Sequence, residues 1–178
     1  MTHLVGISGS LRAASSNTLL VDEAARLFAP DIYTRADLNL PLLNTDLETP
    51  ESVQRLADLV RGADAVIIST AEYNKMIPGL LKNALDWLSI HPDGNPFIGK
   101  PVAIMSSAAG RSGGERSQYT LRHALIPHEA RVLSAPEVTI AGANAAFNDN
   151  GRLKDDKSTE FLTKQMDALK SEIALHSR

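Results

Sequence analysis

The chain has 178 residues, of which 43% are hydrophobic and 22% charged, and its formal net charge is −3. It contains no cysteine, which excludes disulfides, thiolate metal sites and cysteine nucleophiles and fits a reducing compartment. The mild acidity argues against nucleic-acid binding, no apolar run is long enough to span a bilayer, and the N-terminus shows no secretory signal. We therefore expect one globular domain, residues 1–178, in the cytoplasm, with no nucleic-acid partner and no membrane insertion.

Strand-like runs alternate with amphipathic helical patterns, beginning with a strand at residues 3–8 and a helix that Pro30 stops. This helix is predicted to expose Asp22, Glu23 and Arg26 and to bury Leu19, Leu20, Ala24, Leu27 and Phe28. A short strand at residues 31–35 and a proline-broken segment follow. The next helix is predicted to begin with Thr49 as its cap and to end at Gly62, with a buried stripe of Val53, Leu56, Ala57 and Val60.

Residues 63–70 carry a nearly continuous β-branched run, which favours a strand covered on both faces. A helix starting at Pro78 comes next, then a strand at residues 101–107 and a helix that buries Leu121, Ala124 and Leu125. The fifth strand is expected at residues 131–140, interrupted by Pro136. A closing helix is marked by Phe161, Leu162, Met166, Leu169 and Ile173.

Five strands joined by helices predict a parallel sheet with right-handed crossovers and helices on both faces. The carboxyl ends of parallel strands share one edge of the sheet, so the loops after the first, third and fourth strands should emerge together. We call these the first loop (residues 9–17), the middle loop (residues 71–77) and the third loop (residues 107–114). All three loops are polar, and their convergence predicts a ligand site.

The first loop, GSLRAASSN, offers the features of an anion site at the start of a helix. The helix supplies unpaired N–H groups and the positive end of its dipole, Arg12 adds a charge, and hydroxyls come from Ser10, Ser15, Ser16 and Thr18. An ordinary strand-to-helix turn, with Ser16 or Asn17 as the N-cap, fits the same residues.

Several commoner phosphate sites are excluded by the sequence. The first loop lacks the glycine patterns of P-loop nucleotidases and of Rossmann dinucleotide sites, and it has no phosphatase cysteine. The third strand ends in Ser69 and Thr70 where a receiver domain has an acid. A monophosphate with a planar group lying across the other two loops remains, and FMN has that shape.

The first loop resembles the phosphate loop of the NAD(P)H-dependent FMN reductase family, which includes flavodoxin-like quinone, chromate and azo reductases. Residues 72–74 (EYN) with residues 77–88 (IPGLLKNALDWL) are similar to the family's middle-loop signature. Residues 99–103 (GKPVA) with Gly113 and Gly114 are similar to its third loop. The similarity runs from residue 5 to residue 140 with the motifs in register, which makes it more specific than a single glycine motif.

The resemblance implies a flavodoxin-like three-layer sandwich, with a five-stranded parallel sheet in the order 2-1-3-4-5. It also implies non-covalent FMN, NADPH or NADH as co-substrate, quinones, chromate, azo compounds or free flavin as acceptors, and a homodimer or a dimer-of-dimers tetramer. Carried over by position, the phosphate would be held by Ser10, Arg12, Ser15, Ser16 and Asn17. One side of the isoalloxazine would meet Glu72, Tyr73 and Asn74, and the other Ser107, Ala108 and Gly110. No catalytic acid or base is expected, because hydride transfer is the chemistry of the flavin itself.

Some questions stay open at this point. Ala71 stands where the family usually has proline, and Lys75 and Met76 also depart from its pattern, which leaves acceptor preference undetermined. Lys75, Arg111 and Arg116 fit either a positive rim for anionic acceptors and the NADPH 2′-phosphate or ordinary solvated charges. The five histidines show no metal spacing, so no metal site is expected. A flavodoxin-like electron carrier is the alternative to an enzyme, although such carriers tend to be strongly acidic.

Overall fold

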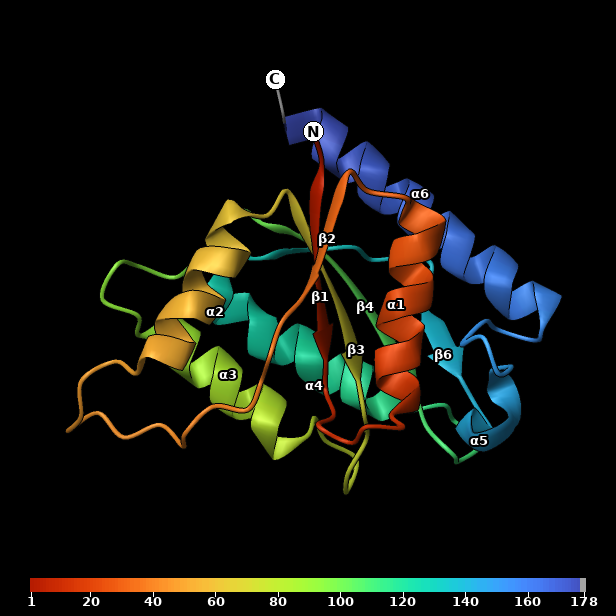
Figure 1. Ribbon diagram of the computed structural model, residues 1–178, viewed down its shortest axis with the longest axis horizontal. Helices are drawn as coiled ribbons and strands as arrows, with labels where there is room; N and C mark the ends of the chain where they lie inside the picture. Colours follow the sequence, from red (N-terminus) through yellow and green to blue (C-terminus); the bar gives the residue numbers. More distant parts are fainter. Residues whose placement is uncertain (177–178) are drawn as a thin grey trace.

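The computed structural model describes residues 1–176, which form a parallel sheet between two layers of helices (Figure 1). The strands are β1 His3–Ser8, β2 Ile32–Arg35, β3 Ala65–Thr70, β4 Pro101–Ser107, β5 Arg131–Val132 and β6 Val138–Ile140. The helices are α1 Ser16–Phe28, α2 Glu51–Gly62, α3 Gly79–Ser89, α4 Glu115–Leu125, the 3₁₀ turn η1 Ile126–His128, α5 Ala143–Ala146 and α6 Asp156–His176. No helix within residues 1–176 is both long and apolar enough to cross a membrane.

The sheet has the strand order β2-β1-β3-β4-β5, and every pairing in it is parallel. In its centre, Val5 of β1 lies opposite Val66 of β3, which lies opposite Val102 of β4. This arrangement confirms the predicted strand order and brings the carboxyl ends of β1, β3 and β4 to one edge.

The predicted interruption of the fifth strand at Pro136 is confirmed, and it divides residues 131–140 into two short strands, β5 and β6. Both pair with β4 at different heights, and Pro136 lies in the gap between them. Since proline has no N–H for a ladder, the pairing is interrupted there. Gln165 of α6 compensates, donating from Nε2 to the carbonyls of Ile104 at 3.0 Å and Pro136 at 2.8 Å.

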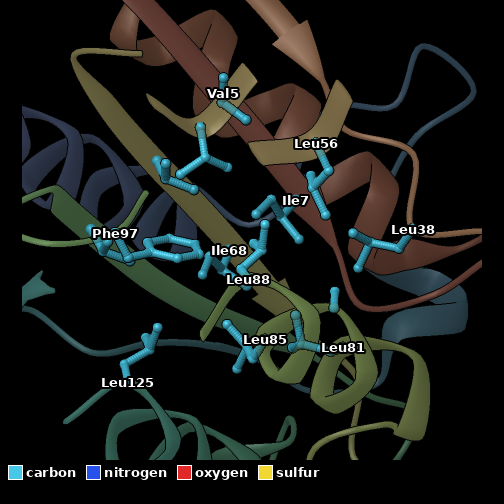
Figure 2. Close-up of a cluster of buried hydrophobic side chains, with 14 of the residues drawn as sticks. Val5, Ile7, Leu38, Leu56, Ile68, Leu81, Leu85, Leu88, Phe97 and Leu125 are labelled. Atoms are coloured by element: carbon cyan, nitrogen blue, oxygen red, sulfur yellow. The ribbon is translucent and has the colours of Figure 1, made fainter. Parts of the chain in front are cut away.

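Successive side chains of each central strand point to opposite faces of the sheet and belong to two separate hydrophobic cores, as expected for a sheet covered on both faces. On one face, Val5, Val66 and Val102 pack with α2, α3 and α4. Figure 2 shows this cluster, in which sheet residues Val5, Ile7 and Ile68 lie against Leu56, Leu81, Leu85 and Leu88. On the other face, the sheet packs against α1 and α6, including the predicted residues Leu162, Met166 and Leu169. Phe161, predicted for the same stripe, is 49% exposed.

Two predictions about the helices are wrong: the exposure of Glu23 on α1 and the cap residue of α2. Glu23, expected to face water, is 2% exposed because it accepts hydrogen bonds from Arg26 at 2.7 Å and from the distant Arg152 at 2.9 Å. At the start of α2, Pro50 rather than Thr49 occupies the cap position, and no side chain caps the helix. Glu23 therefore ties α1 to the segment that precedes α6.

Candidate functional site

A pocket of about 230 Å³ lies where the first, middle and third loops meet at the carboxyl edge of the sheet, the lower edge in Figure 1. Its lining contains all the predicted cofactor-binding residues except Asn74 and Gly110. Those that line it are Ser10, Arg12, Ser15, Ser16, Asn17, Glu72, Tyr73, Ser107 and Ala108. The structure therefore brings together three loops that are far apart in the sequence.

The first loop leads into α1 through Ser15, not through the predicted cap Ser16 or Asn17. Ser15 Oγ accepts a hydrogen bond from the N–H of Asn17 at 3.2 Å, which makes Ser15 the N-cap. The Ser15 hydroxyl keeps its own proton for donation to a ligand. Arg12 is exposed at the mouth of the pocket, and its N–H donates to Ser10 Oγ at 3.3 Å.

These groups form the most anion-favouring part of the pocket. The helix N-terminus, the Ser15 hydroxyl and the Arg12 guanidinium all favour a negatively charged group at the same place. Asn17 behaves differently from its neighbours, because its buried side-chain amide bonds to the ends of β3 and β4.

The middle loop contains a tight turn from Tyr73 to Met76. The N–H of Tyr73 donates to the Met76 carbonyl at 3.1 Å, and the N–H of Met76 donates to the Tyr73 carbonyl at 3.0 Å. Between them, Asn74 and Lys75 have φ angles of 52° and 66°, the pattern of a type I′ turn. The turn holds Asn74 at its tip, which explains why Asn74 is outside the pocket lining while the 57% exposed Tyr73 is part of it.

Glu72, expected against the isoalloxazine, has its carboxylate engaged by the start of α4. Its Oε2 accepts hydrogen bonds from the N–H groups of Arg116 at 3.1 Å and Ser117 at 3.3 Å. The carboxylate pairs the N–H of Arg116, shares the N–H of Ser117 with the Gly114 carbonyl, and interacts favourably with the helix dipole. Glu72 therefore joins the middle loop to the helix that follows the third loop.

The third loop packs tightly because of Gly113 and Gly114, which have φ angles of 60° and 88°. A Cβ on Gly113 would lie 3.0 Å from the backbone of Ile140, and one on Gly114 would lie 3.0 Å from Ser106 Cβ. At the start of this loop, Ser107 lines the pocket, and its buried Oγ has no hydrogen-bond partner. A buried hydroxyl of this kind is suited to a polar atom of a ligand.

The pocket wall also contains four residues that were not predicted from the sequence, Ala71, Ala109, Ala143 and Asn144. Ala143 and Asn144 belong to α5, and the N–H of Ala143 donates to the Ala108 carbonyl at 3.2 Å. The signal that would have found them is the position of this segment after the last strand of the sheet, at the same carboxyl edge. Among residues 1–176, no group of three or more His, Asp or Glu side chains is placed to hold a metal ion.

The proposed rim residues Lys75, Arg111 and Arg116 are exposed, and none of them lines the pocket. Arg116 Nη1 lies 3.7 Å from Glu72 Oε1, so its charge is partly balanced within the protein.

The fold and the pocket define an α/β protein whose pocket, at the carboxyl edge of the sheet, is suited to a phosphorylated ligand. The donor set suits FMN: Arg12, Ser15 and the α1 N-terminus favour a phosphate, and the unpartnered Ser107 hydroxyl is available to another polar group of the cofactor.

The sequence profile of the NADPH-dependent FMN reductase family matches residues 2–145, and the chain belongs to this family. An NAD(P)H-dependent FMN reductase of Pseudomonas aeruginosa is 44% identical over 171 residues, covering 93% of this chain and 92% of the relative. A quinone reductase of Escherichia coli is 37% identical over 175 residues, covering 93% and 92%. The structure of FerB, a flavoenzyme NAD(P)H:acceptor oxidoreductase from Paracoccus denitrificans, superimposes with a TM-score of 0.90 at 32% identity and covers 99% of both chains.

The flavodoxin-like fold and the oxidoreductase class expected from the motifs are thus confirmed. The protein is an FMN-dependent enzyme that takes its electrons from NAD(P)H. The alternative of an electron carrier without this activity is not supported by the family.

Proposed function

We propose that the enzyme passes electrons from NADPH or NADH, through FMN held in the three-loop pocket, to quinones and similar small acceptors. The observation that carries the proposal is the pocket itself, in which an anion site at the start of α1 adjoins a buried, unpartnered hydroxyl at the end of β4. The relative named as a quinone reductase supports the class of acceptor. Chromate, azo compounds and free flavin are further candidates, because an accessible reduced flavin reacts with many acceptors.

The phosphate end of the pocket is assigned to the first loop. Arg12 contributes charge, Ser10, Ser15 and Ser16 contribute hydroxyl groups, and α1 contributes the positive end of its dipole. Ser15 is the most firmly placed of these hydroxyls, because it is 3% exposed and fixed as the helix cap. These groups bind and orient the cofactor and take no part in proton transfer.

The ring end is assigned to the middle and third loops, with Tyr73 and Asn74 on one side and Ser107, Ala108 and Gly110 on the other. Of these residues, Tyr73, Ser107 and Ala108 line the pocket, whereas Asn74 and Gly110 do not. When bound, FMN supplies the redox chemistry, accepting a hydride from the nicotinamide and passing two electrons to the acceptor. The protein's part is to position the ring and to stabilise the negative charge that develops there with nearby N–H groups. The N–H of Ala108 already donates to the Ile140 carbonyl at 3.0 Å, which leaves this role to neighbouring amides of the third loop.

The proposal also covers the oligomeric state of the enzyme and its location in the cell. We expect a homodimer or a dimer of dimers, and exposed apolar side chains around α3 and α4 support an interface there: Ile90, Ile98, Tyr119 and Ile126. Trp87 does not contribute to it, because it is 4% exposed and donates from Nε1 to the Pro41 carbonyl at 2.8 Å. A cytoplasmic location fits the absence of cysteine.

Steady-state kinetics with NADH and NADPH against a panel of quinones, chromate and an azo dye test the proposal. We expect quinone reduction that depends on FMN and on either nicotinamide, with two electrons and two protons converting each quinone to its hydroquinone. An enzyme that NAD(P)H reduces but that transfers nothing to quinones would overturn the choice of acceptor. Light scattering of the purified protein checks the expected dimer or tetramer.

A further inference from the structure

We propose that Asn17 is a positioning residue whose side-chain amide holds the three loops of the pocket together, and that it does not bind the phosphate. The inference rests on the proposed FMN pocket and concerns how that pocket is built. The family resemblance assigns Asn17 to the phosphate of the cofactor, and here it is assigned to the support of the loops instead.

The amide of Asn17 makes three hydrogen bonds to parts of the protein far away in the sequence. Its Oδ1 accepts from Ser69 Oγ at 2.7 Å and from the N–H of Ser107 at 3.0 Å, and its Nδ2 donates to the Ser107 carbonyl at 3.0 Å. The exposed fractions of Asn17, Ser69 and Ser107 are 4%, 0% and 2%. Hydrogen bonds buried to this degree are costly to break, because the groups left behind find no water.

The orientation of this amide follows from its partners. The N–H of Ser107 can only donate and its carbonyl can only accept, so Oδ1 must face the first and Nδ2 the second. With the Ser69 hydroxyl as a second donor, both lone pairs of Oδ1 are occupied. The backbone N–H of Asn17 is also engaged, donating to Ser15 Oγ. Oδ1, one of the two N–H groups of Nδ2 and the backbone N–H of Asn17 are therefore directed at the protein, and only the second N–H of Nδ2 lies outside these bonds.

The three bonds meet where the pocket is formed. Asn17 lies in the first turn of α1, Ser69 is near the end of β3 just before the middle loop, and Ser107 is the last residue of β4. Asn17 engages both polar groups of the Ser107 peptide, as a neighbouring strand would, and so fixes the start of the third loop against the first. The pocket is consequently held in shape before any cofactor binds.

The first test uses the protein without flavin and measures amide hydrogen exchange in the third loop. We expect faster exchange in Asn17→Ala, which loses both bonds to Ser107, and a smaller increase in Ser69→Ala, which loses the bond that helps to orient the Asn17 amide. Arg12→Ala should leave this exchange unchanged, since the Arg12 side chain is exposed. Unchanged exchange in both Asn17→Ala and Ser69→Ala would overturn the proposal, whatever the enzyme's activity.

The second test titrates the flavin-free variants with FMN and with riboflavin, at a temperature where circular dichroism shows all of them folded. Riboflavin lacks the phosphate, so a phosphate ligand affects only FMN, whereas a residue that shapes the whole pocket affects both. We expect Asn17→Ala to weaken both by a similar factor, roughly tenfold. Ser69→Ala should weaken both by less, although Ser69 does not line the pocket.

Leu169→Ala is the matched control for lost stability, because Leu169 is fully buried in the core between the sheet and α6. It should lower the melting temperature and leave both affinities unchanged. If Asn17→Ala weakens FMN alone, Asn17 is a phosphate ligand and the proposal is wrong. If it lowers stability and changes neither affinity, its role is only structural, and the proposal is also wrong. Failure of the proposed function would show separately, as wild-type protein that does not transfer electrons to quinones.

Discussion

The carboxylate of Glu72 caps α4, accepting a hydrogen bond from the backbone N–H of Arg116 at 3.1 Å across 44 positions of the sequence. This contact joins the middle loop to the far end of the third loop. With the amide of Asn17 at the near end, the third loop is fixed at both of its ends by side chains from other loops of the pocket.

Replacement of Glu72 by alanine should destabilise the fold by about 1 kcal/mol, the usual cost of losing a helix cap. Chemical denaturation measures this change. Glu51→Ala is the control, since Glu51 is a highly exposed acid in the first turn of α2 that pairs with Arg55 on the surface. An equal, small loss in both variants would show that Glu72 does not hold α4.

Replacement of Arg12 by alanine should weaken FMN binding by roughly tenfold or more, because a charge-assisted contact to the phosphate is lost. The melting temperature should stay close to that of the wild type, since the side chain is exposed. Fluorescence titration of the flavin-free protein gives the affinity, with Arg55→Ala as a control on a distant surface. Full retention of FMN by Arg12→Ala would mean that the first loop is not the phosphate site.

Glu23 should make stability depend on pH. Burial alone would raise the pKa of its carboxyl, but hydrogen bonds and charges from Arg26 and Arg152 outweigh burial and hold that pKa below its ordinary value of 4.5. A carboxyl with a lowered pKa stabilises the fold above its unfolded pKa, and the stabilisation is lost as the pH falls through the folded pKa. Glu23→Gln should therefore cost about 1–3 kcal/mol at neutral pH.

The difference in unfolding free energy between wild type and Glu23→Gln should shrink as the pH drops below 4.5. Denaturation curves at several pH values measure it. Glu160→Gln is the control, because the Glu160 pair with Lys164 is exposed on both sides and should change little. A Glu23→Gln effect that is independent of pH would show that the charge of Glu23 is not what stabilises the structure.

Gly113 and Gly110 should respond differently to alanine although they lie in the same loop. At Gly113 the φ angle is 60° and a Cβ would lie 3.0 Å from the backbone of Ile140, so Gly113→Ala should lose about 1–3 kcal/mol. At Gly110 nothing lies within 4 Å of the added atom, and stability should be nearly unchanged. The melting temperatures of Gly113→Ala and Gly110→Ala measure this difference. An equal fall in both would contradict the close packing at Gly113.

The sequence predicts the sheet and the convergence of the three loops well, because local patterns mark the strands and the loops. The β-branched run ending at Thr70 and the small residues after Ser107 mark strands and loops by composition alone. Because carboxyl ends of parallel strands share an edge, the meeting of the three loops follows from topology. The break at Pro136 is visible in the sequence too, but its consequence, a fifth strand in two pieces, depends on pairing with β4.

The rest depends on contacts between distant residues, which periodicity does not encode. Glu23 lies on the polar side of a helical pattern, and its burial depends on Arg152, 129 positions away, as well as on the neighbouring Arg26. Asn17 fits a phosphate loop by composition, while its structural role requires Ser69 and Ser107, which are 52 and 90 positions away. Ala143 and Asn144 reach the pocket because the third loop bonds to the segment after β6.

The central claim is that the three-loop pocket holds FMN reducible by NAD(P)H, and the flavin carried by the purified protein tests it most directly. The protein is heated, the released cofactor is identified by chromatography, and a second sample is mixed with NADPH or NADH without oxygen. We predict yellow protein that releases FMN and is bleached by a nicotinamide alone. Protein that is colourless, and stays so after FMN is added and excess flavin removed, would contradict the claim.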